Sequence, residues 1–393
     1  MFIERNVRII MNLRHIGSLS PQKEERLYFI DNLRGALTVL VVLHHLVYFS
    51  IYNEVLTQGS IGVVMGLLFL AFNQTFFMGT FFLISGYFVP LSIERNGTTR
   101  FIKDRSIRFL IPFIFYIFIL SQVQAIEAYI LNQEPFTWQT YFSHLTYGPM
   151  WYVELLFVFV CLYAVWAKFM SKNKLSVVRQ STPPTYRMFT VFVMILAAGY
   201  FTIRLWVPAL DLPGGSPKVQ SFVGLFTASG YDLPQYVGLF ILGIIAYQRN
   251  WFRNTPDSMG RAGFGIAIGA SILLLPLVLL FGVDGLQFSG GWNWTSLVYS
   301  LWEALFCVGV ILGLIIFFRR RVFHQGKGWS FLSAHSFVIY IIHIPIIAIV
   351  IAGLKVIHFP PSFMFLAMIL ITIPLCFLLS YIIKQIPFAS KIL

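Results

Sequence analysis

The chain has 393 residues, of which 58% are hydrophobic and only 11% are charged, and its formal net charge is +13. This charged fraction is less than half of that in ordinary soluble domains, so a soluble globular protein is excluded. The basic residues lie in short clusters between apolar runs, a pattern that argues against a nucleic-acid-binding surface.

Ten apolar segments each approach or exceed the roughly 20 residues needed to cross a bilayer. They are expected at 33–51, 61–93, 105–130, 149–170, 188–207, 231–248, 262–282, 294–318, 331–351 and 362–383. The second segment is long enough to be a tilted or kinked span. None shows the alternating polarity of a barrel strand. The sequence therefore predicts an all-α polytopic membrane protein with about ten transmembrane helices, residues 1–28 being a cytoplasmic tail and 29–393 one integral domain.

The distribution of positive charge predicts the orientation of these spans. Cytoplasmic loops are enriched in lysine and arginine. If the N-terminus is cytoplasmic, 25 of the 28 Lys and Arg residues fall on the cytoplasmic side, and only Arg204, Lys218 and Lys355 do not. Both termini are therefore expected in the cytoplasm.

The three cysteines all lie within apolar runs and form no CxxC pair. Neither a disulfide framework nor a metal site is expected from such a set. We expect no metal.

The segment 33–51 carries the polar residues around which we build the functional hypothesis. A helix turns about 100° and rises about 1.5 Å per residue, so Arg34 and His45 lie within roughly 20° of each other and about 16–17 Å apart. His45 is then near the middle of the bilayer, where an ionisable group is costly and is by default a functional candidate. The alternative is a histidine packed against other helices, which is our expectation for the neighbouring His44.

Arginines gather at the cytoplasmic end of two predicted helices. Arg105 and Arg108 lie on one helix face at i, i+3 spacing, and Arg34 begins the first span. Arginine binds phosphate in a bidentate manner, so these three could hold a cytoplasmic polyanion. The alternative is ordinary topogenic charge at the lipid headgroups.

Four further residues are candidates because of their depth or size. Glu154 lies inside an apolar run and needs a partner or a cavity, either as a helix clamp or as part of the site. Trp151 is either an interfacial aromatic residue or a contact to substrate. His343 either packs or lines the same cavity as His45. Ser85, next to a glycine, allows close approach of a backbone or a thin ligand.

These motifs together resemble the membrane acyltransferase 3 family. The residues that carry the resemblance are IDNLRGALTVLVVLHH at 30–45, FFLISGYF at 81–88, RSIRFLIP at 105–112, MWYVE at 150–154 and HSFVIYIIH at 335–343. The MWYVE version departs from the commoner Trp-Ser-Leu-x-x-Glu form of the family. It looks more like the branch of the glucan succinyltransferases, the glucan biosynthesis protein C branch.

The resemblance implies an integral acyltransferase domain that uses cytoplasmic acyl-CoA to acylate an extracytoplasmic carbohydrate or glycolipid. It implies catalytic roles for Arg34 and His45 and donor binding by the region of Arg105 and Arg108. We add Glu154 as a catalytic candidate, Ser85 for the donor, and Trp151 and His343 for the acceptor. The acyl group is expected to be acetyl or succinyl, and the membrane the plasma membrane of a bacterium.

Two other classes of function fit the same sequence. A transporter or flippase of a lipid-linked saccharide would also have ten spans and buried charge, although we find no paired broken helices in corresponding halves. An inactive assembly partner would tolerate substitution of Arg34 or His45. The sequence favours the enzyme, with membrane lipid as its surroundings and no nucleic-acid partner, and does not indicate an oligomeric state.

Overall fold

The computed structural model describes residues 26–56, 59–171, 182–209 and 230–393, and within them the chain is helical with no strand. Most of the N-terminal tail expected at 1–28 and much of the loops expected around 172–187 and 208–217 lie outside the described residues. The long helices are α2 (Tyr28–Tyr52), α3 (Ile61–Gln74), α4 (Phe77–Asn96), α5 (Thr98–Phe115), α9 (Trp151–Ser171), α10 (Tyr186–Ile203), α11 (Leu233–Gln248), α13 (Asp257–Leu273), α15 (Trp294–Arg321), α16 (Lys327–Val356) and α17 (Pro361–Gln385). Shorter helices are α6 (Ser121–Gln124), α7 (Ile126–Ile130), α8 (Trp138–Ser143), α12 (Trp251–Asn254), α14 (Leu275–Phe281) and α18 (Pro387–Ile392).

The described residues contain nine helical segments that are long and apolar enough to cross a membrane. The predicted all-α polytopic membrane fold is confirmed. The tenth expected span corresponds to α11, whose 16 residues reach only about 24 Å. The segment expected at 61–93 as one tilted or kinked span consists of α3 and α4, which are interrupted at Thr75 and Phe76.

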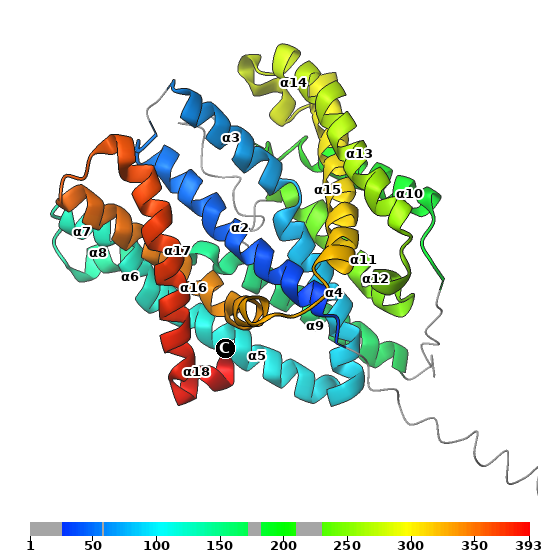
Figure 1. Cartoon of the computed structure of the whole chain (residues 1–393), viewed down its shortest axis with the longest axis horizontal. Helices are drawn as coiled ribbons and strands as arrows, with labels where there is room; N and C mark the ends of the chain where they lie inside the picture. The colour runs from blue at the N-terminus through cyan, green and yellow to red at the C-terminus, as the bar shows by residue number, and fades with distance from the viewer. Residues whose placement is uncertain (1–25, 57–58, 172–181, 210–229) are drawn as a thin grey trace, which may run out of the picture.

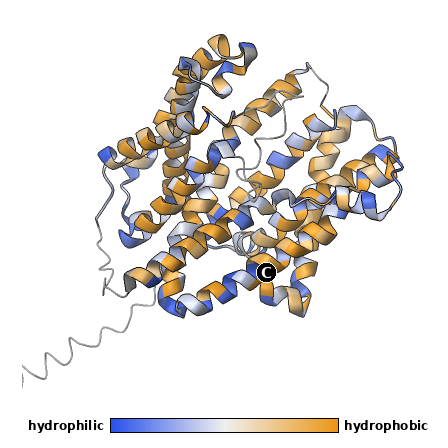
Figure 2. Ribbon diagram, turned by 180° about the vertical axis from the view of Figure 1, so that it is seen from behind, coloured by the Kyte–Doolittle hydropathy of each residue, from blue (hydrophilic) through white to orange (hydrophobic). Residues whose placement is uncertain are grey.

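The α2 helix lies in the middle of the assembly, beside α3, α15 and α16 (Figure 1). Helices α13 and α15 run together along one side, and α16 to α18 lie on the other (Figure 1). Apolar residues cover most of the ribbon, whereas hydrophilic residues gather mainly at loops and helix ends (Figure 2). This distribution is that of a helix bundle solvated by lipid around its middle.

Glycines bring α4 and α11 into backbone contact. A Cβ at Gly86 would overlap the carbonyl of Phe240, and a Cβ at Gly243 would overlap the carbonyl of Leu83. Small residues of this kind allow helices to pack closely where the hydrophobic effect is weak. The close approach expected beside Ser85 is thus made by α11.

The helix α5 continues into a π-helical turn, Tyr116–Leu120, shortly after Pro112. Proline removes a backbone donor, and a π turn widens the helix, so this segment departs from regular geometry. The fully buried Tyr116 of this turn donates a hydrogen bond to Gln124, 2.9 Å away.

A buried ion pair joins α10 to α15 on the side away from most of the basic loops. Arg204 and Glu303 pair directly, and both are almost inaccessible, at 1% and 2% exposed. Arg204 also donates to Ser300 at 3.0 Å and stacks on Tyr200 and Tyr299. Each charge thus has a partner in the apolar interior.

Candidate active site

A cavity of about 600 Å³ opens between α2, α4, α5, α9 and α16, and its lining includes several arginines. It contains all four residues that the sequence suggested for an acyl donor: Arg34, Ser85, Arg105 and Arg108. These residues come from three different helices, which only the fold brings together. The volume lies within the range typical of small-molecule sites.

On one side of the cavity, Asp31 holds Arg34 in place. Its carboxylate lies 3.2 Å from Arg34 Nη2 and 2.7 Å from Arg26 Nε. Arg34 also donates to the backbone carbonyl of Ser333, at 3.5 Å. Because Asp31 precedes Arg34 by one helical turn, the guanidinium is directed by its own helix.

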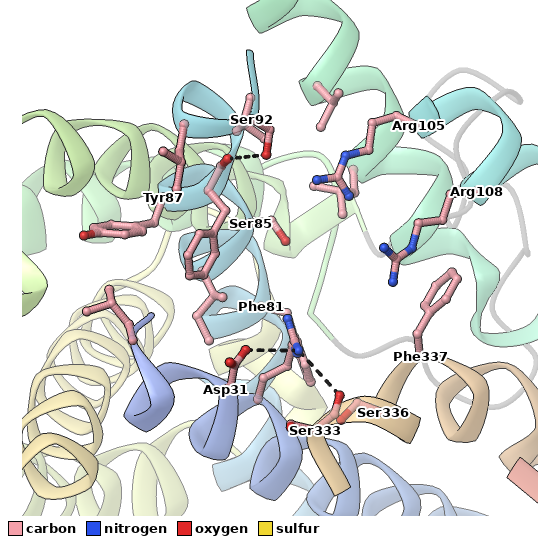
Figure 3. A pocket seen from close by; sticks show the side chains of 18 of the residues that line it. Asp31, Phe81, Ser85, Tyr87, Ser92, Arg105, Arg108, Ser333, Ser336 and Phe337 are labelled. Carbon is pink, nitrogen blue, oxygen red and sulfur yellow. Dashed lines mark hydrogen bonds and ion pairs between the residues drawn. The ribbon is translucent and has the colours of Figure 1, made fainter. Parts of the chain in front are cut away.

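Across the cavity from Asp31 and Ser333, Arg105 and Arg108 of α5 extend into the same space (Figure 3). The Arg105 guanidinium lies 5.3 Å from the ring centre of Phe101 and 5.7 Å from that of Phe109. Arg108 lies 5.4 Å from the ring of Phe337. Arg108 also donates to the backbone oxygen of Leu393, at 3.5 Å. Arg105 forms no ion pair with a carboxylate among the described residues, so the aromatic faces position its charge without neutralising it.

Farther along α2, His45 is coupled to His343 of α16. The two rings meet at 3.3 Å between His45 Nδ1 and His343 Nε2. His45 Nδ1 also lies 2.9 Å from the carbonyl of Val41, and His343 Nδ1 lies 2.7 Å from that of Tyr340. Carbonyl oxygens only accept, so each Nδ1 carries the hydrogen, and His45 Nε2 is left as the basic nitrogen.

The cavity ends before it reaches this histidine pair. Its inner wall includes Thr38, Tyr152 and Tyr340, and neither His45 nor His343 lines it. The ring of Tyr340 lies 5.9 Å from that of His343, and its hydroxyl donates to the carbonyl of Pro149. Tyr340 therefore separates the cavity from the histidines.

The two α9 candidates lie outside the cavity wall. Tyr152, Val153, Leu156 and Val160 are the α9 residues in the lining, and Glu154 and Trp151 are not among them. Trp151 instead packs against Tyr236 of α11, with 5.4 Å between ring centres.

Tyr152 and Tyr340 are lining residues that the sequence analysis missed. Tyr152 shares a 3.0 Å hydrogen bond with Ser85. Tyr152 follows Trp151 directly in the MWYVE motif, and Tyr340 lies three residues before His343 in the HSFVIYIIH motif. Their positions within these motifs were the sequence signal that could have identified them. His44 is buried and stacks on Phe77, at 4.8 Å, as expected for a packing residue.

Over the described part of the chain, no group of three or more His, Cys, Asp or Glu side chains is arranged to hold a metal ion.

Comparison with known proteins assigns the family. A family model described as an acyltransferase domain matches residues 27–381. The chain belongs to the acyltransferase 3 family. It is therefore a multi-pass membrane acyltransferase, and it needs an acyl donor.

Curated relatives include the proteins named Glucans biosynthesis protein C of Salmonella paratyphi B and Salmonella dublin. Each is 24% identical to this acyltransferase over 344 residues, which is 84% of both chains. No solved structure matches the chain.

Proposed function

We propose that this acyltransferase moves an acetyl or succinyl group from cytoplasmic acyl-CoA to a hydroxyl of an extracytoplasmic carbohydrate or glycolipid. The observation that carries the proposal is the cavity in which Arg34, Arg105 and Arg108 converge on the basic side. A nucleotide with several phosphates matches three arginine side chains. The name of the relatives supports a glucan as the acceptor, and the proposed location is a bacterial plasma membrane.

In this proposal the donor lies along the cavity, with its phosphates among the three arginines. The thin pantetheine arm extends past Ser85 and Tyr152 toward Tyr340. The about 16–17 Å between Arg34 and His45 along α2 is comparable with the length of such an arm. The thioester reaches His45 when the Tyr340 side chain moves from the inner wall.

The acceptor approaches His45 from the opposite side of the membrane. His45 Nε2 takes the proton of the acceptor hydroxyl as its oxygen attacks the thioester carbonyl. The carbon–sulfur bond then breaks, and the departing thiolate receives the proton from His45. His343 holds His45 in the tautomer that this step requires. General base catalysis of this kind contributes on the order of 10²–10⁴-fold.

The test is acyl transfer by purified His45→Ala protein, with His44→Phe as the matched control. His45→Ala should lose about 10²–10⁴-fold in rate while acyl-CoA still raises its thermal stability. The control, next to His45 but packed on Phe77, should retain transfer. Wild-type rates in folded His45→Ala protein would refute the mechanism, and a wild-type protein that acyl-CoA does not stabilise would favour a transporter.

A further inference from the structure

The helix face that carries Arg34 and His45 continues to the outer end of α2 with two tyrosines. At about 100° per residue, Tyr52 lies about 20° and Tyr48 about 60° from His45 around the axis. They lie about 10 Å and about 4–5 Å farther along it. One face of one helix thus connects the cavity, the histidine and the outer surface.

Neighbouring helices cover the other sides of the outer half of α2. Ile51 packs against Gly66 of α3, and the Ser50 hydroxyl contacts α17. Asn53 accepts a 2.9 Å hydrogen bond from Lys355 of α16. The remaining side is the one that carries the two tyrosines.

Both tyrosines are accessible, and their rings are nearly parallel. Tyr48 is 48% exposed and Tyr52 is 74% exposed. Their ring centres are 6.4 Å apart, with 8° between the planes. In the described residues neither hydroxyl makes a hydrogen bond. Each tyrosine therefore offers an apolar face together with a free polar group.

We propose that Tyr48 and Tyr52 form a carbohydrate subsite that presents an acceptor hydroxyl to His45; this rests on the proposed function. A sugar ring has an apolar C–H face that packs on an aromatic ring and hydroxyls that need polar partners. Polar side chains lie next to Tyr52 in the chain, because the following residue, Asn53, is hydrogen-bonded to Lys355, which also contacts Glu127. Continuity with His45 distinguishes this pair from aromatic residues that only anchor a helix at the lipid interface.

The experiment compares Tyr48→Ala/Tyr52→Ala with Trp294→Ala. Trp294 is a matched control because it is 53% exposed at the outer end of α15 and packs against another aromatic residue, Phe281, with 5.8 Å between the ring centres. The probe is a short glucose oligosaccharide, and the readouts are its Kd by calorimetry, its KM in acyl transfer and the KM of acyl-CoA. A third variant, Tyr48→Phe/Tyr52→Phe, retains the rings.

We expect the double alanine variant to raise the oligosaccharide Kd and KM about tenfold and to leave the KM of acyl-CoA unchanged. The phenylalanine variant should retain most of the binding, and Trp294→Ala should bind as wild type. An unchanged Kd in the double alanine variant, or an equal rise in Trp294→Ala, would overturn the subsite and indicate a lipid anchor. Because the Kd needs no turnover, it tests the subsite even if transfer from acyl-CoA is absent and the proposed function fails.

Discussion

Replacement of Arg105 by alanine separates recognition of the donor's phosphates from recognition of its thioester arm. The guanidinium projects into the cavity and rests on two phenylalanine rings without a carboxylate partner among the described residues. A charge-assisted hydrogen bond to phosphate contributes about 1.5–3 kcal/mol. Its loss should therefore raise the KM of acyl-CoA about 10- to 150-fold.

The assay uses two donors, acyl-CoA and the corresponding acyl-pantetheine, which lacks the nucleotide phosphates. Arg105→Ala should raise the KM of acyl-CoA and leave the KM of acyl-pantetheine unchanged. The matched control is Arg100→Ala on the same helix, since Arg100 is highly exposed and pairs with Asp104 at 3.9 Å. A thermal melt checks folding, because the lost aromatic contacts cost about 1–2 kcal/mol. An equal rise in KM for both donors, or an unchanged KM for acyl-CoA, would refute the assignment of Arg105 to phosphate.

Two further predictions concern pairs between helices. His343→Leu removes the hydrogen-bond acceptor that lies 3.3 Å from His45 Nδ1. In steady-state kinetics, kcat should therefore fall about 2- to 10-fold while the KM of acyl-CoA stays unchanged. An altered KM of acyl-CoA would instead argue that His343 contacts the donor directly. Arg204→Met leaves Glu303 as an unpaired buried charge and should destabilise the fold by about 3–5 kcal/mol. Adding Glu303→Leu should restore much of the thermal stability, and a double variant no more stable than Arg204→Met would show that the pair is not the cause.

The positions of the spans could be predicted from the sequence because they depend on local composition. Hydrophobic length and loop charge are both local properties, and the predicted segments overlap long helices, except that 231–248 corresponds to the 16-residue α11. The shared face of Arg34 and Thr38 on α2 was likewise predictable, since helix geometry alone places these residues together. That Arg105 and Arg34 lie near one another was a hypothesis based on their predicted positions at the cytoplasmic ends of two helices. In the structure both residues line the same cavity.

The inner wall of the cavity could not be predicted, because it depends on which helices are neighbours. Tyr152 and Tyr340 lie in apolar runs, where an aromatic side chain is equally suited to packing or to the lipid interface. Only the fold places Tyr152 beside Ser85, and only the fold turns Tyr340 toward the histidine pair. Glu154 was a candidate because of its depth alone, and depth does not specify the direction in which a side chain points.

The glycine contacts between α4 and α11 have a mechanical consequence. With the carbonyl of Phe240 against Gly86, neither helix can slide or rotate without a steric clash, so α11 stiffens α4, which lines the cavity. The facing wall is α5, where Pro112 and the π-helical turn interrupt the regular hydrogen bonding. Because α5 carries Arg105 and Arg108, we expect the cavity to widen more readily on the α5 side than on the α4 side.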